Sequence, residues 1–443
     1  REGKKMKKIA AHKMNNMKPV HIIISYYFVS VVIAVLLLSL PFVYQSGVEV
    51  SFIDKLFTAV SAVSVTGLTV INLTEVLTPF GMIMLIFILQ LGGLGVMSIG
   101  TFFWLIFRKK IGLKERKLIM VDQNKPTLSG AVHLIKDIIK IFLLIELVGA
   151  IILSIYYLQY FPTWEEAVLN GVFASVSATT NAGFDITGYS LIPFATDYFV
   201  QLIHTVLIVL GAIGFPVLIE VKEFLFSKNV NERFRFSLFT KVTTITFLLL
   251  FILGTVIILV IEWNHAFKNM AWHQSFFTAF FQSVSTRSAG LATIDVNEFS
   301  PSTLLIMCGL MFIGASPSSV GGGIRTTTFA ICILFLYHFA KGNTSIKVFE
   351  RELHEDDVRK AFAVVILAFF LCPLLHLLFE ICSAFGTTGF SLGVTSELSS
   401  FGKIILMGMM FVGRIGVLSF LMLIGGKEKP THFHYPKERI IIG

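Results

Sequence analysis

The chain has 443 residues, of which 55% are hydrophobic and only 14% are charged. Soluble domains usually carry about 25% charged residues, so this composition excludes an ordinary soluble enzyme or binding module and indicates an integral membrane protein. The formal net charge of +9 suggests nucleic acid as a partner only until the positions of the charges are considered.

Most of the 36 lysine and arginine residues lie in five segments, separated by pairs of apolar runs: residues 1–20, 108–140, 222–241, 341–360 and 427–439. By the positive-inside rule, we expect these segments and both termini on the cytoplasmic side of the cell membrane. The distribution argues against nucleic acid, and attraction to anionic membrane lipid explains the same charges.

Apolar runs such as 20–43 and 80–107 exceed the roughly 20 residues that a membrane-spanning helix needs. Between them the chain repeats one pattern four times: FTAVSAVSVTGL at 57–68, FASVSATTNAGF at 173–184, FFQSVSTRSAGL at 280–291 and FEICSAFGTTGF at 379–390. In each copy a Phe precedes a Gly by ten residues, with Phe280 taken as that Phe in the third. Ser61, Ser177 and Ser383 also match, whereas the third copy has Val284 at that position.

A second glycine motif follows each copy at nearly constant spacing and begins at Gly92, Gly211, Gly314 and Gly413. Two motifs that recur in the same order indicate a fourfold internal repeat. We therefore predict an all-α membrane protein of four units around a central pseudo-fourfold pore. Each unit contains an outer spanning helix, a short pore helix, a glycine-containing pore loop and an inner spanning helix.

The predicted boundaries are a cytoplasmic N-terminal segment at 1–20, pore repeats at 21–125, 126–235, 236–345 and 346–426, and a cytoplasmic C-terminal tail at 427–443. The short helices begin near Asp54, Glu166, Trp272 and His376. At about 12 residues they cannot cross the bilayer and must re-enter it. The fourth outer helix runs into its pore helix with no polar turn, so either this connection is unusually tight or residues are missing from the sequence there.

The pore loops have the chemistry of a cation filter, because small residues ending on a Gly that can adopt positive φ let backbone carbonyls face the axis. The predicted ion-binding residues are Val65, Thr66, Gly67, Asn181, Ala182, Gly183, Ser288, Ala289, Gly290, Thr387, Thr388 and Gly389. The carboxyl-terminal end of each short helix adds a favourable dipole. An alternative, that glycines only permit close helix packing, fits Gly92, Gly95, Gly211 and Gly214 better than the loop glycines.

The third inner helix differs from the other three, which we expect to be uninterrupted. A Pro and four glycines make a continuous helix improbable there, and the irregular backbone must be shielded from lipid. The predicted gate comprises Gly314, Ala315, Ser316, Pro317, Ser318, Ser319, Gly321, Gly322, Gly323, Arg325 and Arg414. A static kink is the alternative for the loop, and a salt bridge or carbonyl cap is the alternative for Arg414.

Three arginines, Arg287, Arg325 and Arg414, lie in or beside glycine-rich apolar segments. A cation in such a place is costly and is by default a functional candidate. By contrast, His133, His204, His338 and Glu146 are interpreted as packed or interfacial polar residues and not as ligands.

The four loops, the broken third inner helix and Arg414 resemble the superfamily of Trk, Ktr and HKT potassium transporters, and most closely its Ktr-type membrane subunits, the KtrB branch. With a Gly in all four filter loops, the resemblance implies potassium selectivity, with the potassium ion held at the filter carbonyls and no organic cofactor. It also implies a homodimer on a cytoplasmic ring of nucleotide-binding regulatory subunits. One filter Gly per loop, where tetrameric channels carry Gly-Tyr-Gly, predicts looser discrimination.

Other function classes are less well supported by the sequence. An enzyme lacks support because no HExxH motif and no GxGxxG motif that opens a soluble βαβ unit is found. A symporter more often shows two inverted halves with charged midplane residues. A less selective sodium/potassium pore remains an alternative.

Overall fold

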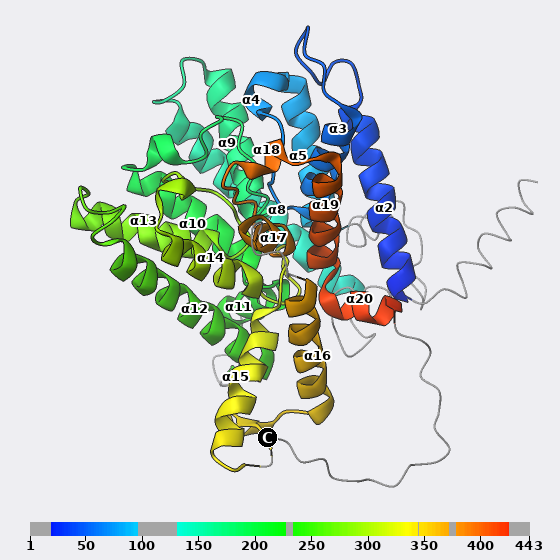
Figure 1. The fold of residues 1–443 in the computed structure, drawn as a ribbon, viewed down its shortest axis with the longest axis vertical. Coiled ribbons are helices and arrows are strands. Elements are labelled where there is room, and N and C mark those ends of the chain that lie inside the picture. Colours follow the sequence, from blue (N-terminus) through cyan, green and yellow to red (C-terminus); the bar gives the residue numbers. More distant parts are fainter. Residues whose placement is uncertain (1–18, 96–130, 227–233, 344, 372–377, 425–443) are drawn as a thin grey trace, which may run out of the picture.

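The computed structural model describes residues 19–95, 131–226, 234–343, 345–371 and 378–424. These residues are mostly helical (Figure 1), which confirms the predicted fold class. One hairpin, formed by β1 (Lys347–Val348) and β2 (Arg351–Glu352), joins the third unit to the fourth. The predicted tail at 427–443, nearly all of the segment 1–20, the boundary at residue 125 and the connection at His376 lie outside the described residues.

The described parts of the four units share the order outer helix, pore helix, short helix and inner helix, and a further helix follows in the second, third and fourth. The first contains α2 (Pro19–Leu38), α3 (Phe52–Ser64), α4 (Leu73–Val76) and α5 (Pro79–Gly93). The second contains α8 (Ala131–Tyr157), α9 (Trp164–Thr179), η1 (Ile192–Phe194), α10 (Tyr198–Ala212) and α11 (Phe215–Leu225). The third contains α12 (Leu238–Glu262), α13 (Trp272–Ser285), η2 (Val296–Glu298), α14 (Pro301–Ile313) and α15 (Thr326–Ala340). The fourth contains α16 (Glu355–Leu371), α17 (Leu378–Phe385), α18 (Val394–Glu397), α19 (Ser400–Ile415) and α20 (Val417–Ile424).

Capping residues explain where the inner helices begin. The side chain before the first residue of each inner helix accepts a hydrogen bond from a backbone N–H in its first turn, and these caps are Thr78, Asp197, Ser300 and Ser399. Such caps satisfy amide groups that have no partner inside the helix. Pro79 and Pro301 then occupy the first helical position, where the missing N–H costs nothing.

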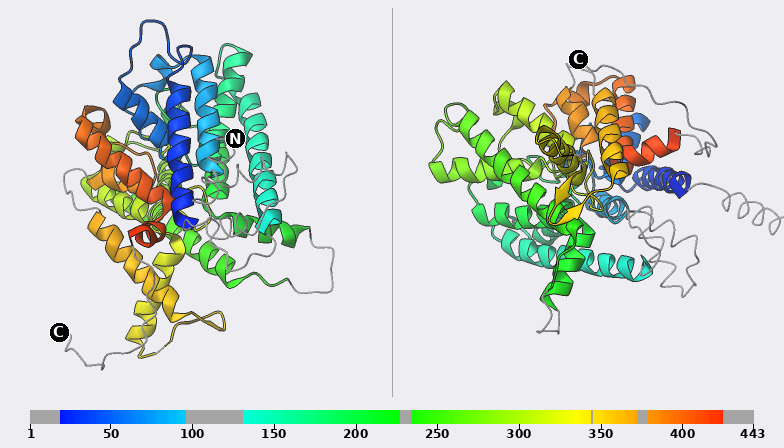
Figure 2. Two further views of the ribbon diagram at one scale, coloured as in Figure 1. Left: turned by 90° about the vertical axis from the view of Figure 1, so that its right-hand side faces the viewer. Right: turned by 90° about the horizontal axis from the view of Figure 1, so that it is seen from below.

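The four units close into a ring. The inner helix of each unit contacts the pore helix of the next: α5 with α9, α10 with α13, α14 with α17, and α19 with α3. Figure 2 shows this arrangement from two further sides. At the closing seam, Lys403 Nζ lies 2.6 Å from Asp54 Oδ1. Partial burial raises the pKa of the Asp54 carboxyl, but hydrogen bonds from Lys403 and Ser51 outweigh this and leave the pKa below its usual range.

Some of the described helices have the length and apolarity of membrane spans. Within the described residues, α8 from His133 and α12 are both long and apolar enough to cross a bilayer, and α10 with α11 forms a bent pair that qualifies as one broken span. Leu144, Leu147, Ile151 and Ile155 on α8 are all at least half exposed. Their spacing places them on one face of the helix, as expected for a surface against lipid.

The expectation that three inner helices are uninterrupted is wrong. α10 and α11 meet at an angle of 105°, α19 stops before Gly416, and α5 stops at Gly93. The last glycine of the motif lies just after the end of each of these helices and has positive φ: 76° at Gly95, 102° at Gly214 and 89° at Gly416. A positive φ is incompatible with an α-helix. The run 80–107 is therefore not one continuous helix, and its part from residue 96 lies outside the described residues.

The two glycines of each motif have different roles. A Cβ atom at Gly92 would lie 2.6 Å from the Val63 oxygen, and one at Gly211 would lie 2.1 Å from the Thr179 oxygen. Both glycines therefore allow the inner helix to approach the end of a pore helix, which confirms the packing interpretation for them. Packing does not explain Gly95, whose φ is positive and whose added Cβ would have nothing within 4 Å. Gly214 also has positive φ, and a Cβ there would in addition lie 2.8 Å from the Pro317 oxygen, so packing accounts for it in part.

Replacing Gly413 by Ala should destabilise the protein, because the new Cβ would lie 1.9 Å from the Phe385 oxygen. Overpacking of this kind costs about 1–3 kcal/mol, measurable as a lower thermal unfolding midpoint in detergent. Gly408→Ala is the matched control, since Gly408 lies in the same helix with nothing within 4 Å. Equal midpoints for the two variants would contradict the packing argument.

Candidate functional site

The four pore loops share an unusual backbone conformation. Two residues before each filter glycine, a non-glycine residue has positive φ: Val65 (58°), Asn181 (53°), Ser288 (89°) and Thr387 (47°). The glycines themselves have φ values of 86° at Gly67, 66° at Gly183, 65° at Gly290 and 95° at Gly389. The residue between them has no positive φ. Alternation of this kind turns successive carbonyl groups toward the same side, and a strained backbone that persists is typical of a functional site.

The loops interlock around a closed ring. A Cβ atom at Gly67 would lie 2.3 Å from the Ala182 oxygen, and one at Gly183 would lie 2.7 Å from the Ala289 oxygen. In the same direction, a Cβ at Gly290 would lie 2.0 Å from the Thr388 oxygen, and one at Gly389 would lie 2.2 Å from the Thr66 oxygen. Each glycine thus abuts the carbonyl that precedes the glycine of the next loop.

The structure therefore brings all twelve predicted filter residues to one place, although they come from segments more than 300 residues apart. Their non-glycine members are fully buried. Their role in binding an ion stays a prediction.

Hydrogen bonds from the pore helices hold the loops. Ser177 Oγ donates to the Phe184 oxygen and Ser285 Oγ donates to the Leu291 oxygen, both at 2.6 Å. In the fourth unit the Gly389 N–H donates to Ser383 Oγ at 3.0 Å. Ser177 and Ser285 thus hold the residue after the filter glycine, and Ser383 holds the filter glycine itself.

The alignment that placed Val284 opposite the three serines is wrong by one residue. Ser285 makes the contact that Ser177 makes, and the fully buried Phe281 stands four residues before it, as Phe173 stands before Ser177. Phe280 is only half-buried. The third loop is therefore one residue shorter than the others, and counting back from the glycine concealed the serine.

The ring offers oxygen atoms but no fixed negative charge. None of the twelve residues has a charged side chain. Among the residues that the structure describes, no group of three or more His, Cys, Asp or Glu side chains is placed to hold a metal ion. A cation at the ring would accordingly be coordinated by carbonyl oxygens, which replace its hydration shell without trapping it.

The interrupted segment between α14 and α15, residues 314–325, packs directly against the filter loops. The Gly322 N–H donates to Ser288 Oγ at 3.3 Å, and a Cβ at Gly322 would lie 2.6 Å from Thr387 Oγ1. We call this segment the gate loop, and its role in gating stays a prediction.

The tip of the gate loop rests on the break in the second inner helix. Ser316 N–H donates to the Ala212 oxygen at 3.1 Å, and Phe215 N–H donates to the Ser318 oxygen at 2.8 Å. We did not predict these contacts from the sequence. Pro216, at the second position of α11, was the available signal, because Pro is favoured in the first turn of a new helix.

Arg414 connects the gate loop to the first inner helix. Its guanidinium donates to the carbonyl oxygens of Val320 and Gly92, and lies 3.4 Å from the Gly93 oxygen. Arg325 donates to the Gly321 oxygen within the gate loop. The contacts of Arg414 are those of the carbonyl-cap alternative, and they leave its positive charge beneath the filter.

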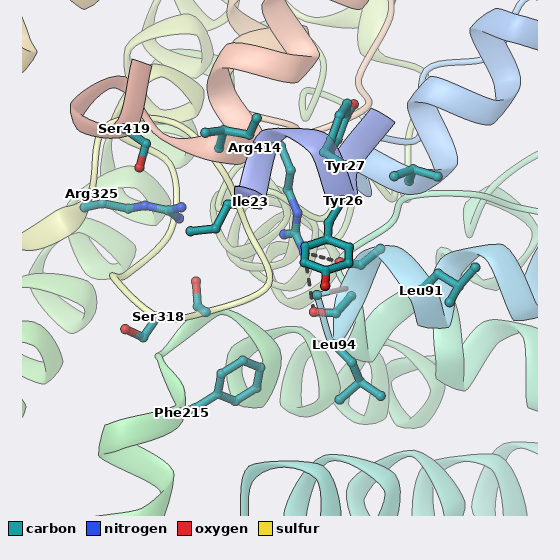
Figure 3. Close-up of a pocket in the computed structure, with 16 residues that line it drawn as sticks. Ile23, Tyr26, Tyr27, Leu91, Leu94, Phe215, Ser318, Arg325, Arg414 and Ser419 are labelled. Carbon is teal, nitrogen blue, oxygen red and sulfur yellow. Dashed lines mark hydrogen bonds between the residues drawn. The ribbon is translucent and has the colours of Figure 1, made fainter. Parts of the chain in front are cut away.

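A cavity of about 150 Å³ lies beside these arginines. Figure 3 shows Arg325, Ser318 and Ser419 on one side of it and Tyr26 on the other, with Arg414 between. Gate-loop residues line this cavity, and none of the twelve filter residues does.

The other polar residues lie where packing or an interface explains them. His204 is buried, with Nδ1 2.8 Å from the Val200 oxygen, and Glu146 accepts a hydrogen bond from Gln90. His133 is largely exposed beside Asp137. His338 lies 3.0 Å from the Asn343 side chain.

Comparisons with known proteins agree with this architecture. Residues 4–431 match the family model TrkH, described as "Cation transport protein". The chain is 56% identical to "Ktr system potassium uptake protein D" of Bacillus subtilis, covering 96% of this chain and 98% of that protein. It is 33% identical to "Ktr system potassium uptake protein B" of the same organism, over 94% and 95%. "Potassium/sodium uptake protein NtpJ" of Enterococcus hirae is 31% identical, over 96% and 98%.

A solved structure has the same fold. The potassium transporter TrkH from Vibrio parahaemolyticus superposes with a TM-score of 0.73 over 96% of this chain and 87% of that chain, at 19% sequence identity.

Proposed function

Because the chain belongs to the TrkH family of cation transport proteins, we propose that it takes up potassium ions across the cell membrane through the ring of four filter loops. The observation that carries the proposal is the closed ring in which each filter glycine abuts the carbonyl before the next one. Two of the similar proteins are named potassium uptake proteins.

The mechanism follows from the chemistry of the ring. A potassium ion exchanges its hydration water for carbonyl oxygens, and the negative ends of four pore helices favour a cation at the same point. Since the filter residues have no charge, the ion is not trapped and moves on. Its selectivity depends on carbonyl positions that only glycine allows at this spacing.

The distribution of charges supports an orientation. The hairpin between α15 and α16 carries Lys347 and Arg351, whereas Asp54, Glu165 and Asp197 stand at the starts of pore and inner helices. The hairpin and both termini are accordingly cytoplasmic, and the pore helices begin at the extracellular face.

The partners in this proposal come from the resemblance to Ktr-type subunits. The chain forms a homodimer in membrane lipid, and the homodimer sits on a cytoplasmic ring of nucleotide-binding regulatory subunits. It binds potassium as its only ligand, without an organic cofactor, and does not act as an enzyme.

A second candidate function is a less selective sodium/potassium pathway. Each loop has only one filter glycine, and one similar protein is named a potassium/sodium uptake protein. Competition of sodium with rubidium tracer flux in proteoliposomes separates the two: a sodium-selective or non-discriminating flux favours the second candidate.

The gate loop controls the flux in this proposal. Its contacts with Ser288 and Ala212 support a position across the ion path. Most of its residues are small, which suits a gate that moves at low energetic cost, and Arg414 holds it to the first inner helix.

Gly67→Ser should reduce the preference for potassium over sodium. The new Cβ would collide with the Ala182 oxygen at 2.3 Å, so we expect roughly a tenfold change, equivalent to about 1.4 kcal/mol in relative ion binding. Gly47→Ser is the control, because Gly47 has a similar φ of 88° and nothing within 4 Å. Potassium uptake in a transport-deficient host is the measurement, and unchanged affinity with unchanged sodium competition would refute the filter assignment.

Arg414→Gln should raise the flux, because it removes both a tether of the gate loop and a positive charge near the ion path. Two unit charges about 8 Å apart repel by roughly 2 kcal/mol at an effective dielectric constant of about 20, so we expect roughly a thirtyfold increase. Arg359→Gln removes an exposed arginine on α16 and is the control. If Arg414→Gln inserts normally into proteoliposomes and still gives wild-type flux, Arg414 acts only as a structural cap of the carbonyl groups.

Deleting residues 316–319 should raise potassium flux severalfold and make it less dependent on the regulatory partner, since the tip then no longer reaches Ala212 and Phe215. Tracer flux is measured with and without the partner. If the variant folds, reaches the membrane and conducts no faster than wild type without the partner, the segment is a static kink.

A further inference from the structure

Arg287 directly precedes the filter residues of the third loop, and the proposed function gives it no role. It stands immediately before the left-handed residue Ser288, at the position that Ser64, Thr180 and Gly386 occupy in the other units. Its side chain is fully buried. A buried cation that lacks a counter-charge is destabilising, so its presence needs a specific explanation.

The surroundings of Arg287 satisfy it poorly. Nη1 lies 3.5 Å from the Gly314 oxygen, a long hydrogen bond, and Nε and Nη2 have no partner among the described residues. No described carboxylate forms an ion pair with it. The nearest favourable potential is the carboxyl-terminal end of α13, which ends two residues earlier at Ser285.

Gly314 is the first residue of the gate loop, and the next filter residue contacts the other end of the same loop. Ser288 Oγ accepts from Gly322 N–H at 3.3 Å and donates to the Thr387 oxygen at 2.8 Å. Gly314 and Gly322 adjoin each other, because Ala315 N–H donates to the Gly322 oxygen at 3.1 Å. Arg287 and the filter residue Ser288 thus hold both strands at the neck of the gate loop.

From these contacts we infer that Arg287 is a positioning residue that couples the gate loop to the third filter loop, so that displacement of the gate loop changes the preference of the filter between potassium and sodium. The inference rests on the proposed function. When the neck moves, Arg287 loses the carbonyl it holds, and Ser288 loses the N–H that helps to keep it at a φ of 89°. The carbonyls of Ser288 and Thr387 then shift within the ring.

The test is a double-mutant cycle on the full chain, with Arg414→Gln used to release the gate loop. Two readouts apply: the ratio of rubidium to sodium flux in proteoliposomes, and the ratio of the potassium and sodium concentrations that half-maximally raise the thermal midpoint in detergent. Both ions carry one charge, so these ratios report carbonyl geometry and respond little to the lost charge itself. Releasing the loop should change both ratios by about threefold or more in the wild-type background and by less than about 1.5-fold in Arg287→Gln.

Thr286→Val is the matched control, since Thr286 Oγ1 donates to the Ser283 oxygen inside the pore helix. In this variant, Arg414→Gln should change both ion ratios by the full amount. The inference would be overturned, while the proposed function stands, by either of two results. Arg414→Gln could change the ion ratios as much in the Arg287→Gln background as in the wild-type background, or it could leave them unchanged in the wild-type background. If Arg287→Gln does not fold, Ser288→Ala replaces it, and an undiminished change in that variant overturns the inference equally. A chain that neither binds nor transports either cation would overturn the proposed function together with the inference.

Discussion

Backbone amide and carbonyl groups inside a membrane must find partners within the protein, and this requirement governs the rest of the structure. Hydrocarbon offers no hydrogen bonds, so irregular backbone survives only where protein surrounds it. The four filter loops, the gate loop and the breaks after the inner helices all depart from helical geometry. They contact one another, as when Ser316 N–H meets the Ala212 oxygen, and the outer helices stand between them and lipid. The irregular regions thus satisfy each other, and together they provide the polar lining that a cation needs.

Departures from fourfold symmetry are concentrated in two units. The third unit contributes Arg287, a shorter filter loop and the gate loop, and the fourth contributes Arg414. The first two units supply carbonyl acceptors for these groups, at Gly92 and Ala212. A single chain permits this division, because each quarter of the ring is encoded separately. The ring of filter loops keeps near-symmetry, and the asymmetric parts lie next to it.

Sequence patterns predicted much of this arrangement. The spacing of the two glycine motifs revealed the four units, and the excess of small residues with a Pro located the gate loop. What the patterns could not supply was the φ of individual residues: Gly92 and Gly95 look equivalent in the sequence, yet the first packs against a pore helix and the second ends a helix. Likewise the third loop lacks one residue, and only its three-dimensional contacts show that Ser285 corresponds to Ser177. The interlocking of Gly67 with the Ala182 oxygen depends on tertiary contacts that no local pattern encodes.

Closure of the ring by the fourth unit has a consequence for biogenesis. Gly389 abuts the Thr66 oxygen, and α19 packs against α3, so the first and last quarters of the filter meet only through segments synthesised near the end of the chain. While the nascent chain emerges and folds from its amino terminus, the first three pore loops already lie in the bilayer with one side of their backbone open. The ring is therefore completed only after translation of the last pore loop. Until the last unit docks, the exposed polar backbone of the first three pore loops is a feature that membrane protein quality control can recognise.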